Sequence, residues 1–546
     1  MLPPPPLKGL YRDDSRARAA YAEAAGIYRI LPRAVALPLD PDDLLHLVCW
    51  AADYGVALIP RGAGSAMGGG NVGDGVVVDL TRMAGQRIDI DRNAAHAVTG
   101  AGITLAQLNA AAASHRLRLP PDPSSGRWAT LGGMVATNAA GARSVRYGSV
   151  RGWVESLTLV TADGESVALQ RGATPPSSAA LSRFTQDAAP VIRAEAALIR
   201  TRFPHTRKNS SGYALDAFVK SGDVLDLLVG AEGTLGIVTE IGWRLDPVPA
   251  VRAGVRASLR STELLGEAVE ALMVCGPSAI ELLDRTFLDL VAQDTLVGTG
   301  LRFTGAEAVL LVELERDDPA SLRDALEKTT ARLRPIAHSV DTAFTAEAAE
   351  RLWDVRHAAS PILARLPEER RSLQVIEDAC VPLASMSRYI QFVRRAASSH
   401  QIPVVMFGHA GDGHIHVNLL PEVGRAGWEQ EVAALLEEVT TEVIALGGTP
   451  SGEHGDGRLR AHTLERVFGS EIVGLFRRVK DSFDPQGLFN PGVILPAGEP
   501  PISRLKVGET AVTLPLDIQE SLREIERTAG YGRSRLELAG EPEARR

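Results

Sequence analysis

The chain contains the glycine-rich stretch Arg61-Gly62-Ala63-Gly64-Ser65-Ala66-Met67-Gly68-Gly69-Gly70, which connects two apolar runs at residues 56–60 and 75–80. Short apolar runs bounded by glycine indicate buried strands. Glycine lets a backbone approach a ligand closely, and successive free N–H groups in such a loop form a concave surface for anions. We therefore expect an anion-binding loop between two strands. A glycine-rich hairpin that binds nothing is the alternative that this stretch leaves open when it is taken alone.

Two common glycine-rich motifs do not fit this stretch. The spacing of Gly62, Gly64 and Gly68 is one residue longer than G-x-G-x-x-G, and only residues 71–74 separate the glycines from the next strand. That leaves no room for the helix that follows the loop of a Rossmann fold. A Walker A loop is excluded as well, because no Lys-Ser or Lys-Thr pair follows.

Two further segments are rich in glycine and other small residues. Residues 129–141 follow the sequence Pro120-Pro121-Asp122-Pro123-Ser124-Ser125, and residues 230–239 form the other segment. Because the side chains are small, the backbone itself can line a flat surface. Three such surfaces in one half of the chain indicate an extended ligand with a phosphate group and a planar part.

The composition excludes several classes of protein. The 546 residues include 58 Lys and Arg against 67 Asp and Glu, a net charge of −9, which argues against a nucleic-acid partner. No apolar run approaches the ~20 residues of a transmembrane segment, and the N-terminus lacks the features of a secretion signal. The three cysteines form no CxxC pair, which excludes a disulfide scaffold and a local four-cysteine Fe–S cluster. We expect a cytoplasmic protein, with a peripheral position at the membrane left open.

Histidines gather in two short glycine-rich segments. The run His414-Ile415-His416-Val417-Asn418-Leu419 alternates polar and apolar residues, so a strand places its polar side chains on one face, with His409 across the preceding turn. Glu453 and His454 lie in the second segment, residues 451–457. Imidazole and carboxylate together suit divalent Zn, Mn, Fe or Co. Histidines that only form hydrogen bonds are the alternative that the spacing leaves open.

The remaining segments carry simpler signals. Residues 309–314 indicate a strand, and residues 320–333 have the apolar spacing of a helix. Residues 520–538 are highly charged and predict a surface helix on a separate C-terminal segment, and we expect residues 541–546 to be disordered.

Five motifs in order carry a resemblance to a known family. They are Pro60–Ser65, Pro120–Gly133, Glu232–Ile237, Gly408–His416 and Phe489–Gly492. Over about residues 27–496, the chain resembles the FAD-linked oxidases of the vanillyl-alcohol-oxidase type, within them the D-lactate/glycolate/D-2-hydroxyglutarate dehydrogenase group. The resemblance implies an α+β fold with a two-subdomain FAD-binding unit and a substrate domain of antiparallel sheet and flanking helices. The implied divisions are a helical N-terminal lead-in 1–26, the FAD-binding domain 27–248, the substrate and metal domain 249–465, a segment 466–496 that returns to FAD, and a charged extension 497–546.

The resemblance also implies which residues contact FAD. The first loop would hold the pyrophosphate, the second segment would line the flavin and diphosphate, and the third would hold the adenosine end. The implied cofactor residues are Arg61, Gly62, Ala63, Gly64, Ser65, Gly68, Pro121, Asp122, Ser125, Thr130, Gly132, Gly133, Asn138, Gly141, Tyr147, Glu232, Gly236, Ile237 and Asn490. Some relatives attach FAD through His or Cys, but residues 60–70 contain neither, so we expect non-covalent FAD.

By the same resemblance, His409, His416 and Glu453 are ligands of a divalent metal such as Zn, Mn or Fe, and His454 is the general base. A neutral imidazole with a pKa near 7 can accept a hydroxyl proton. Arg356 matches the cation that binds the substrate carboxylate, with a solvated arginine on a helix face as the alternative. His414 replaces the usual Asn and is a fourth ligand, a substrate contact or a residue that supports the ligands. Glu377 and Asp378 are expected only as supporting residues.

The implied activity is the oxidation of a D-2-hydroxy acid, of lactate, glycolate or 2-hydroxyglutarate type, to the 2-oxo acid with hydride transfer to flavin N5. The alternatives are a flavoprotein subunit of a larger glycolate-oxidase-like complex and an oxidase that uses O₂ directly. The electron acceptor is expected to be a quinone, a cytochrome, an electron-transfer flavoprotein or an Fe–S partner chain. Residues 497–546 contain no cysteine, so an Fe–S cluster would have to reside on another chain.

Overall fold

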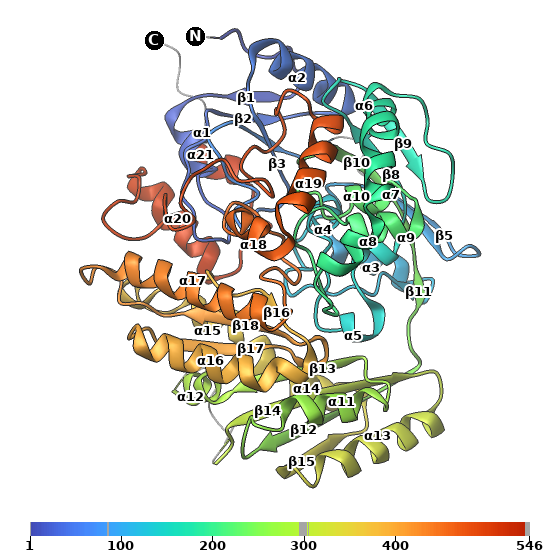
Figure 1. Ribbon diagram of the computed structural model, residues 1–546, viewed down its shortest axis with the longest axis vertical. Helices are drawn as coiled ribbons and strands as arrows, with labels where there is room; N and C mark the ends of the chain where they lie inside the picture. The colour runs from blue at the N-terminus through green and yellow to red at the C-terminus, as the bar shows by residue number, and fades with distance from the viewer. Residues whose placement is uncertain (1, 84–86, 294–302, 304, 541–546) are drawn as a thin grey trace.

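The computed structural model describes residues 2–83, 87–293, 303 and 305–540. The tail 541–546, for which we expected disorder, lies outside the described residues. Figure 1 shows two parts, an upper one that contains both ends of the described chain and a lower one built on a large sheet. We call the upper part the N-terminal unit and the lower part the second unit. Among the described residues, no helix is long and apolar enough to cross a bilayer.

The first sheet of the N-terminal unit holds the glycine-rich loop. Its strand order is β1 (Leu10–Arg12), β2 (Ala34–Leu37), β4 (Val76–Asp79), β3 (Leu58–Arg61). Strands β3 and β4 are parallel, with Leu58 opposite Val76, and the loop crosses between them without a helix. The sheet packs on α2 (Pro41–Tyr54), which begins at the N-cap Asp40 and ends at Gly55 in the left-handed conformation. The expected strand–loop–strand arrangement is confirmed.

The second sheet of the N-terminal unit is antiparallel. Its order is β5 (Ile88–Asp91), β6 (His96–Gly100), β10 (Ile237–Arg244), β8 (Val154–Val160), β9 (Ser166–Gln170), and the short strands β7 (Leu117–Arg118) and β11 (Asp246–Pro247) form a separate pair. Its helices are α3 (Leu105–Ala113), α4 (Leu131–Thr137), α5 (Ser144–Tyr147), α6 (Ala179–Arg183), α7 (Ala189–Ala194), α8 (Ala196–Arg202), α9 (Leu215–Ser221) and α10 (Leu225–Leu228). The two glycine-rich segments at 129–141 and 230–239 border this sheet at α4 and at the start of β10.

The second unit is one antiparallel sheet covered by helices. The strand order is β15 (Ala337–Ala343), β12 (Val251–Leu259), β14 (Ala308–Arg316), β13 (Ala279–Asp284), β17 (Val404–His409), β18 (His414–Leu419), β16 (Ala379–Cys380). Its helices are α11 (Leu265–Met273), α12 (Arg285–Gln293), α13 (Pro319–Leu333), α14 (Ala346–His357), α15 (Ala359–Ala364), α16 (Met386–Ser399) and α17 (Trp428–Ala445). Helices α11, α13, α16 and α17 lie in front of the sheet in Figure 1. The predicted strand at 309–314, the predicted helix at 320–333 and the α+β fold class are confirmed.

The chain returns to the N-terminal unit after the second unit. Helices α18 (Leu464–Phe468) and α19 (Ser470–Phe483) share a core with the second sheet, where Phe476 packs on Phe203 and Tyr213. The next residues pair with β3, since the backbone N–H of Leu58 donates to Leu488 O and that of Asn490 donates to Leu58 O.

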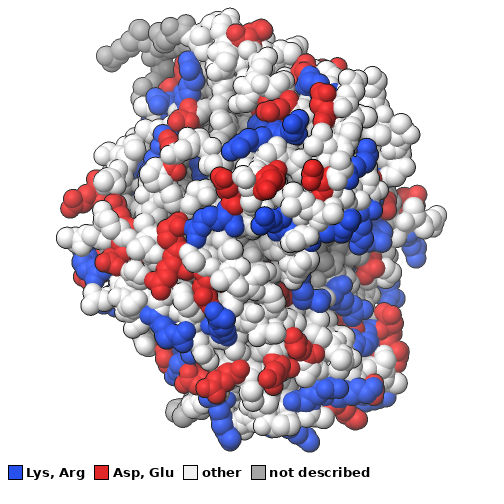
Figure 2. Space-filling view, viewed as in Figure 1, with Lys and Arg blue, Asp and Glu red and all other residues white. Residues whose placement is uncertain are grey.

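The two ends of the chain differ from their expectations in one respect each. The N-terminal lead-in contains strand β1 as well as the short helix α1 (Ser15–Ala20), so it is not purely helical. The charged extension forms two helices, α20 (Leu516–Arg527) and α21 (Arg535–Ala539), in place of the one surface helix expected over residues 520–538. Its apolar face is buried on α1 and on strands β2, β3 and β4 through Ile518, Leu522 and Ile525. Acidic and basic side chains are interspersed over the face shown in Figure 2.

Candidate functional site

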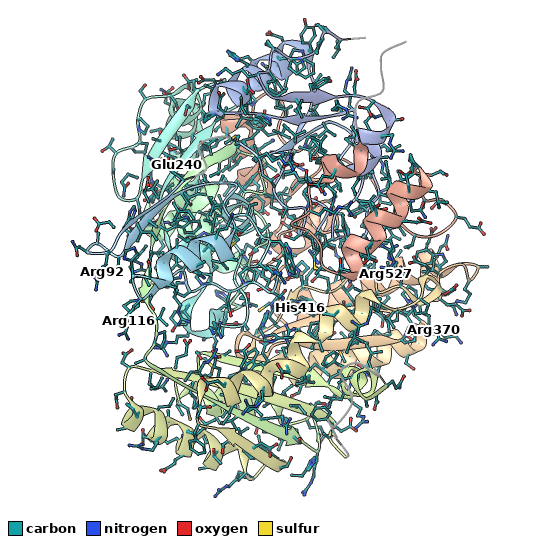
Figure 3. The ribbon with its side chains drawn as sticks, turned by 180° about the vertical axis from the view of Figure 1, so that it is seen from behind. Arg92, Arg116, Glu240, Arg370, His416 and Arg527 are labelled. Atoms are coloured by element: carbon teal, nitrogen blue, oxygen red, sulfur yellow. The ribbon has the colours of Figure 1, made fainter. Side chains whose placement is uncertain are left out.

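A cavity of about 1180 Å³ runs between the two units and is bordered by all three glycine-rich segments. This exceeds the ~300–1,000 Å³ of an ordinary ligand pocket. The histidine cluster lies on its second-unit side, and His416 lies near the centre of the molecule in Figure 3. Residues 526–529 and Tyr531 of the C-terminal extension also line it, which nothing in the charge pattern of that segment indicated. The cavity therefore has the extended shape that three separate surfaces require.

Most of the residues expected to contact a cofactor line this cavity. Those on its wall are Arg61, Gly62, Ala63, Gly64, Ser65, Asp122, Ser125, Thr130, Gly132, Gly133, Glu232, Gly236 and Ile237. The others expected there do not line it, namely Gly68, Pro121, Asn138, Gly141, Tyr147 and Asn490. Tyr147 and Asn490 form side-chain hydrogen bonds of their own. The Tyr147 hydroxyl donates to Glu315, and Asn490 Nδ2 donates to the carbonyl oxygens of Gly70 and Glu232 at 2.7 and 2.9 Å. Asn490 thus joins the first glycine-rich loop to the third segment.

Glu232 is a buried carboxylate in the glycine-rich part of the cavity wall. It accepts hydrogen bonds from the backbone N–H groups of Asp456 and Gly457. Burial raises its pKa, the nearby Asp456 adds to this effect, and the resulting pKa is about 8. Glu232 therefore ties the third glycine-rich segment to the loop that carries Glu453 and His454.

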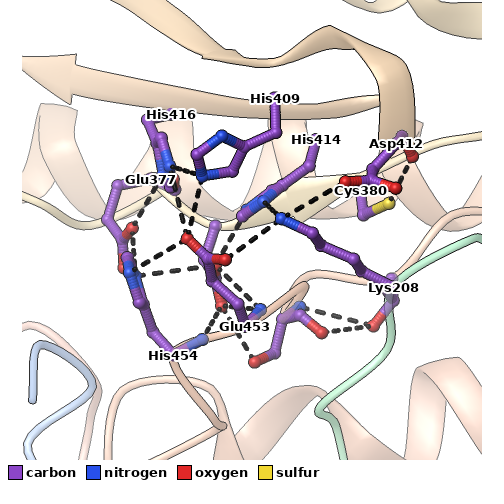
Figure 4. Close-up of polar contacts among 12 residues, drawn as sticks. Lys208, Glu377, Cys380, His409, Asp412, His414, His416, Glu453 and His454 are labelled. Carbon is purple, nitrogen blue, oxygen red and sulfur yellow. Dashed lines mark hydrogen bonds and ion pairs between the residues drawn. The ribbon is translucent and has the colours of Figure 1, made fainter. Parts of the chain in front are cut away.

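The three residues expected to bind a metal come together beside the neighbouring strands β17 and β18 of the second-unit sheet. His409 ends β17, His416 lies on β18, and Glu453 reaches them from the loop at 451–457 (Figure 4). The Nε2 atoms of His409 and His416 are 3.3 Å apart. Glu453 Oε1 lies 3.2 Å from His409 Nε2 and 3.5 Å from His416 Nε2.

When the two rings are neutral, the partners of their Nδ1 atoms leave both Nε2 atoms as acceptors. His409 Nδ1 contacts the carboxylate of Glu281, and His416 Nδ1 lies 2.9 Å from the carbonyl oxygen of Glu377. Each Nδ1 therefore carries the proton, because carbonyl and carboxylate oxygens only accept. Two lone pairs and a carboxylate oxygen then face the same point. Metal-binding histidines are oriented by such Nδ1 partners.

The donor set fits a divalent cation. Ligands held about 2.0–2.1 Å from a tetrahedral ion lie about 3.4 Å from one another. The three separations of 3.2, 3.3 and 3.5 Å among His409 Nε2, His416 Nε2 and Glu453 Oε1 match this edge length. All three side chains are buried, with 6–10% of each exposed. Buried groups with facing lone pairs need a cation or a proton between them.

His454 lies beside this cluster and is held by two carboxylates. Its Nδ1 lies 2.7 Å from Glu377 Oε2, its ring stacks on His416, and its Nε2 lies 3.7 Å from Glu453 Oε1. Burial lowers its pKa, but the charges of Glu377 and Asp378 outweigh that effect and raise the pKa to about 10. The two acidic neighbours thus favour the protonated ring, whereas a general base requires the neutral imidazole expected for His454. Glu377 and Asp378 do support the site, as expected.

Arg356 lies on α14 and borders the cavity with 10% of its side chain exposed, so the alternative of a solvated arginine is wrong. Its Nε donates to Glu281 Oε2 at 2.7 Å, and its guanidinium lies over the ring of Phe407. Among the described residues, the only hydrogen bond that its guanidinium makes is the one from Nε. Glu281 thus orients both Arg356 and His409. Burial raises the pKa of Glu281, but the positive charges of His409 and Arg356 outweigh burial and lower this pKa to about 2.

Several residues of this site were not predicted. Glu281 comes from the apolar strand β13, and Lys208 from the segment before α9. A glutamate inside an apolar strand is a signal of a buried charge with a partner, but the partner lies 128 residues away in sequence. Arg460, which donates to Glu377, completes the buried set. His414 contacts Asp378 and Lys208 and lies within reach of the other ligands.

Comparisons with known proteins agree with this geometry. The family described as "FAD linked oxidases, C-terminal domain" matches residues 248–494, and the "FAD binding domain" family matches residues 32–170. Glycolate oxidase subunit GlcD of Bacillus subtilis is 30% identical over 486 residues, 88% of this chain and 93% of that protein. D-lactate dehydrogenase of Archaeoglobus fulgidus is 29% identical over 474 residues, 85% and 93% of the two chains. D-2-hydroxyglutarate dehydrogenase of Pseudomonas putida is 31% identical over 517 residues, 89% of this chain but 50% of that protein, so this chain spans about half of it.

Solved structures share the fold at low sequence identity. A 4-ethylphenol oxidase from Gulosibacter chungangensis superimposes with a TM-score of 0.64 at 15% identity and covers 89% of this chain and 94% of its own. An alkyldihydroxyacetonephosphate synthase superimposes with a TM-score of 0.60 at 17% identity, with 88% and 83% covered. At these identities the likeness concerns the fold.

Proposed function

Since the chain belongs to the family of FAD-linked oxidases and dehydrogenases, we propose that it oxidises a D-2-hydroxy acid to the 2-oxo acid. One observation carries the proposal. The ligand triad His409, His416 and Glu453, with tetrahedral spacing, opens onto a glycine-lined cavity beside the partly unpaired guanidinium of Arg356. A hydroxyl and an adjacent carboxylate are the two groups that such a site can bind at once.

Two groups would bind in the cavity. FAD would lie along the walls at 61–65, 129–133 and 232–237, where the residues are small enough for its planar ring and where the loop offers N–H groups to phosphate. It supplies the acceptor of the hydride and its two electrons. A divalent cation would be held by His409, His416 and Glu453. When bound, it supplies Lewis-acid chemistry, because its charge lowers the pKa of the substrate hydroxyl and of a neighbouring imidazolium.

The side chains of the site then have separate tasks. The terminal nitrogens of Arg356 bind the substrate carboxylate, and Glu281 fixes the guanidinium from behind. His454 takes the hydroxyl proton on Nε2, since its Nδ1 is engaged with Glu377. The carboxylate of Glu377 holds the ring in place and stabilises the positive charge that it gains. With the hydroxyl proton accepted by His454 and the hydride accepted by a bound FAD, the alpha carbon would become the carbonyl carbon of the 2-oxo acid.

An anaerobic reduction experiment tests this function. The purified chain, loaded with FAD and a divalent cation, is mixed with D- and L-lactate, glycolate and D-2-hydroxyglutarate while the visible flavin absorbance is followed. We expect at least one of these hydroxy acids to bleach the flavin, and D-enantiomers to do so faster than L-enantiomers. No bleaching by any of them in a chain that holds both groups would overturn the proposal.

Arg356 offers a matched pair of variants for the same assay. Arg356→Met should raise the substrate concentration for half-maximal reduction by about tenfold or more, because a charge-assisted pair with the carboxylate is lost. Arg351→Met on the same helix removes an exposed charge that does not line the cavity and should change nothing.

The acceptor of the electrons is part of the proposal. We place it on a separate partner, which is a quinone, a cytochrome, an electron-transfer flavoprotein or an Fe–S chain. Peroxide measured during turnover in air checks this. Stoichiometric peroxide would instead indicate an oxidase that uses O₂.

A further inference from the structure

A short segment of the N-terminal unit, residues 208–212, lies alongside the loop that carries Glu453 and His454. Its contacts are distributed over residues 449–456, in and just before that loop. They join Asn209 to the Thr449 hydroxyl, Ser210 N–H to Ser451 O, Lys208 to Glu453, and the Ser211 hydroxyl and Gly212 N–H to Asp456. Two chain segments about 240 residues apart are thus held side by side at the site.

Lys208 is the member of this segment that reaches the ligands. Its side chain is 5% exposed, and its Nζ donates to Glu453 Oε2 and to the carbonyl oxygen of Gly141, both at 3.1 Å. The same Nζ lies 3.5 Å from His414 Nδ1 and 3.5 Å from Asp412 Oδ2. Figure 4 shows the lysine directed into the cluster from the side opposite His454.

These contacts divide the two oxygens of Glu453. Oε1 faces His409 and His416, whereas Oε2 is engaged by Lys208 and by the backbone N–H of Gly141 at 3.0 Å. A carboxylate whose second oxygen is occupied in this way can offer a cation only one oxygen.

Lys208 also explains why His414 does not act as a fourth ligand. The ring Nε2 lies 2.9 Å from Asp378 Oδ1 and donates to it, so Nδ1 is an acceptor and faces the Lys208 ammonium. His414 otherwise belongs, by distance, to a set of four possible ligands with His409, His416 and Glu453. A tetrahedral cation with four protein ligands is a closed structural site, whereas three ligands leave one position for a substrate.

We propose that Lys208 is a positioning residue that keeps the cation site open, by occupying Glu453 Oε2 and by withholding His414 from the ligand set. This inference rests on the proposed function only in that it requires the cation site to exist.

The expected effect of removing Lys208 is opposite to that of structural damage. In Lys208→Met the ammonium no longer repels the cation, and His414 Nδ1 and Glu453 Oε2 become free to bind it. We expect Zn²⁺ affinity to rise by about tenfold or more, since ligand and supporting contacts each change metal affinity by roughly 10–100-fold. Flavin reduction by the hydroxy acid should fall by about tenfold or more, because the substrate loses its position on the cation.

The experiment is a calorimetric titration of Zn²⁺ into the FAD-loaded full chain, repeated with Co²⁺ so that its absorption spectrum reports the coordination. The variants are Lys208→Met, His414→Asn and the double variant. Lys220→Met, an exposed lysine on the next helix, is the matched control and should behave as the parent chain. His414→Asn should bind Zn²⁺ within about threefold of the parent, because His414 is not a ligand there.

The double variant isolates the added ligand. It should bind Zn²⁺ about tenfold more weakly than Lys208→Met and lack the altered Co²⁺ spectrum of that variant. Weaker Zn²⁺ binding in Lys208→Met, or a loss of tenfold or more in His414→Asn alone, would overturn the role of Lys208. Absence of Zn²⁺ and Co²⁺ binding in the parent chain would instead overturn the cation site of the proposed function.

Discussion

The two ends of the cavity are built in different ways. The cofactor end is made of backbone and small side chains, as at Gly64 and Gly236, both of which have positive φ. The histidine end is made of buried charged and titratable side chains that hold one another, such as His409 with Glu281 and Lys208 with Glu453. The cofactor end is therefore defined by the free space between small residues, and the histidine end by ion pairs and hydrogen bonds between buried side chains.

This difference decides how each end responds to change. At the glycine end an added side chain fills the cavity, whereas an altered charge has little to act on. At the histidine end an isosteric change of charge leaves a buried partner unpaired, which costs more than the loss of volume. A substitution at the histidine end should therefore leave FAD binding intact, and a substitution at the glycine end should leave cation binding intact.

The largest effect is expected at the histidine end. Glu453→Gln keeps the shape of the side chain but removes the charge that a divalent cation requires. We expect flavin reduction by the hydroxy acid to fall by about 10³-fold or more, because several kcal/mol of stabilisation by the cation are lost. Stopped-flow absorbance of the flavin measures the rate.

The FAD content of Glu453→Gln is the decisive control. It should equal that of the parent chain, since the carboxylate of Glu453 is directed toward His409, His416 and Lys208. A variant that lost FAD together with activity would show that the two ends of the cavity are coupled.

The same difference explains what the sequence could reveal. The glycine-rich walls and the strand–loop–strand around residues 61–70 were predicted, because small residues and apolar runs are local signals. The meeting of His409, His416 and Glu453 was implied by the family resemblance. Glu281, Lys208 and the paired role of Asp378 did not, because each is defined by a contact across 128, 245 or 36 residues. No local pattern records such a contact.

The sequence of the C-terminal extension contains the apolar pattern of a packed helix. Ile518, Leu522 and Ile525 recur at spacings of four and three residues, which is the apolar stripe of a helix that packs. The high charge of the segment obscured this stripe. Its charged residues are themselves engaged, since Glu526 pairs with Arg371 and Lys506 beside the cavity.

The second prediction concerns the glycine end. A Cβ at Gly133 would meet only Thr130 Oγ1, at 3.0 Å, and the residue borders the cavity, so Gly133→Val places its methyl groups where FAD would lie. We expect FAD affinity to fall by roughly tenfold to a hundredfold, as overpacking costs about 1–3 kcal/mol. Fluorescence titration of the FAD-free chain measures it.

Zn²⁺ binding and a matched valine test the separation in this direction. Gly133→Val should bind Zn²⁺ like the parent chain. Gly474→Val, in a helix where nothing lies within 4 Å of an added Cβ, should leave both affinities unchanged. Equal loss of FAD in the two valine variants would mean that the cavity at Gly133 is not the cofactor site.

The smallest effect is expected where the two modes of construction meet, at Glu232, the buried carboxylate of the glycine end. Its pKa is raised from an ordinary value of about 4.5 to about 8, so between these values the folded chain holds a proton that the unfolded chain has released. Rising pH therefore favours the unfolded chain across this window, by about 1 kcal/mol per pH unit for this group, and the loss levels off above pH 8.

Glu232→Gln removes the titration, so the urea midpoint of the FAD-free variant should fall less steeply with pH than that of the parent. Glu240→Gln, at an exposed position on β10, is the control and should keep the parent slope. Parallel slopes for all three chains would mean that Glu232 is ionised in the folded chain and that this end, too, is held together by charge.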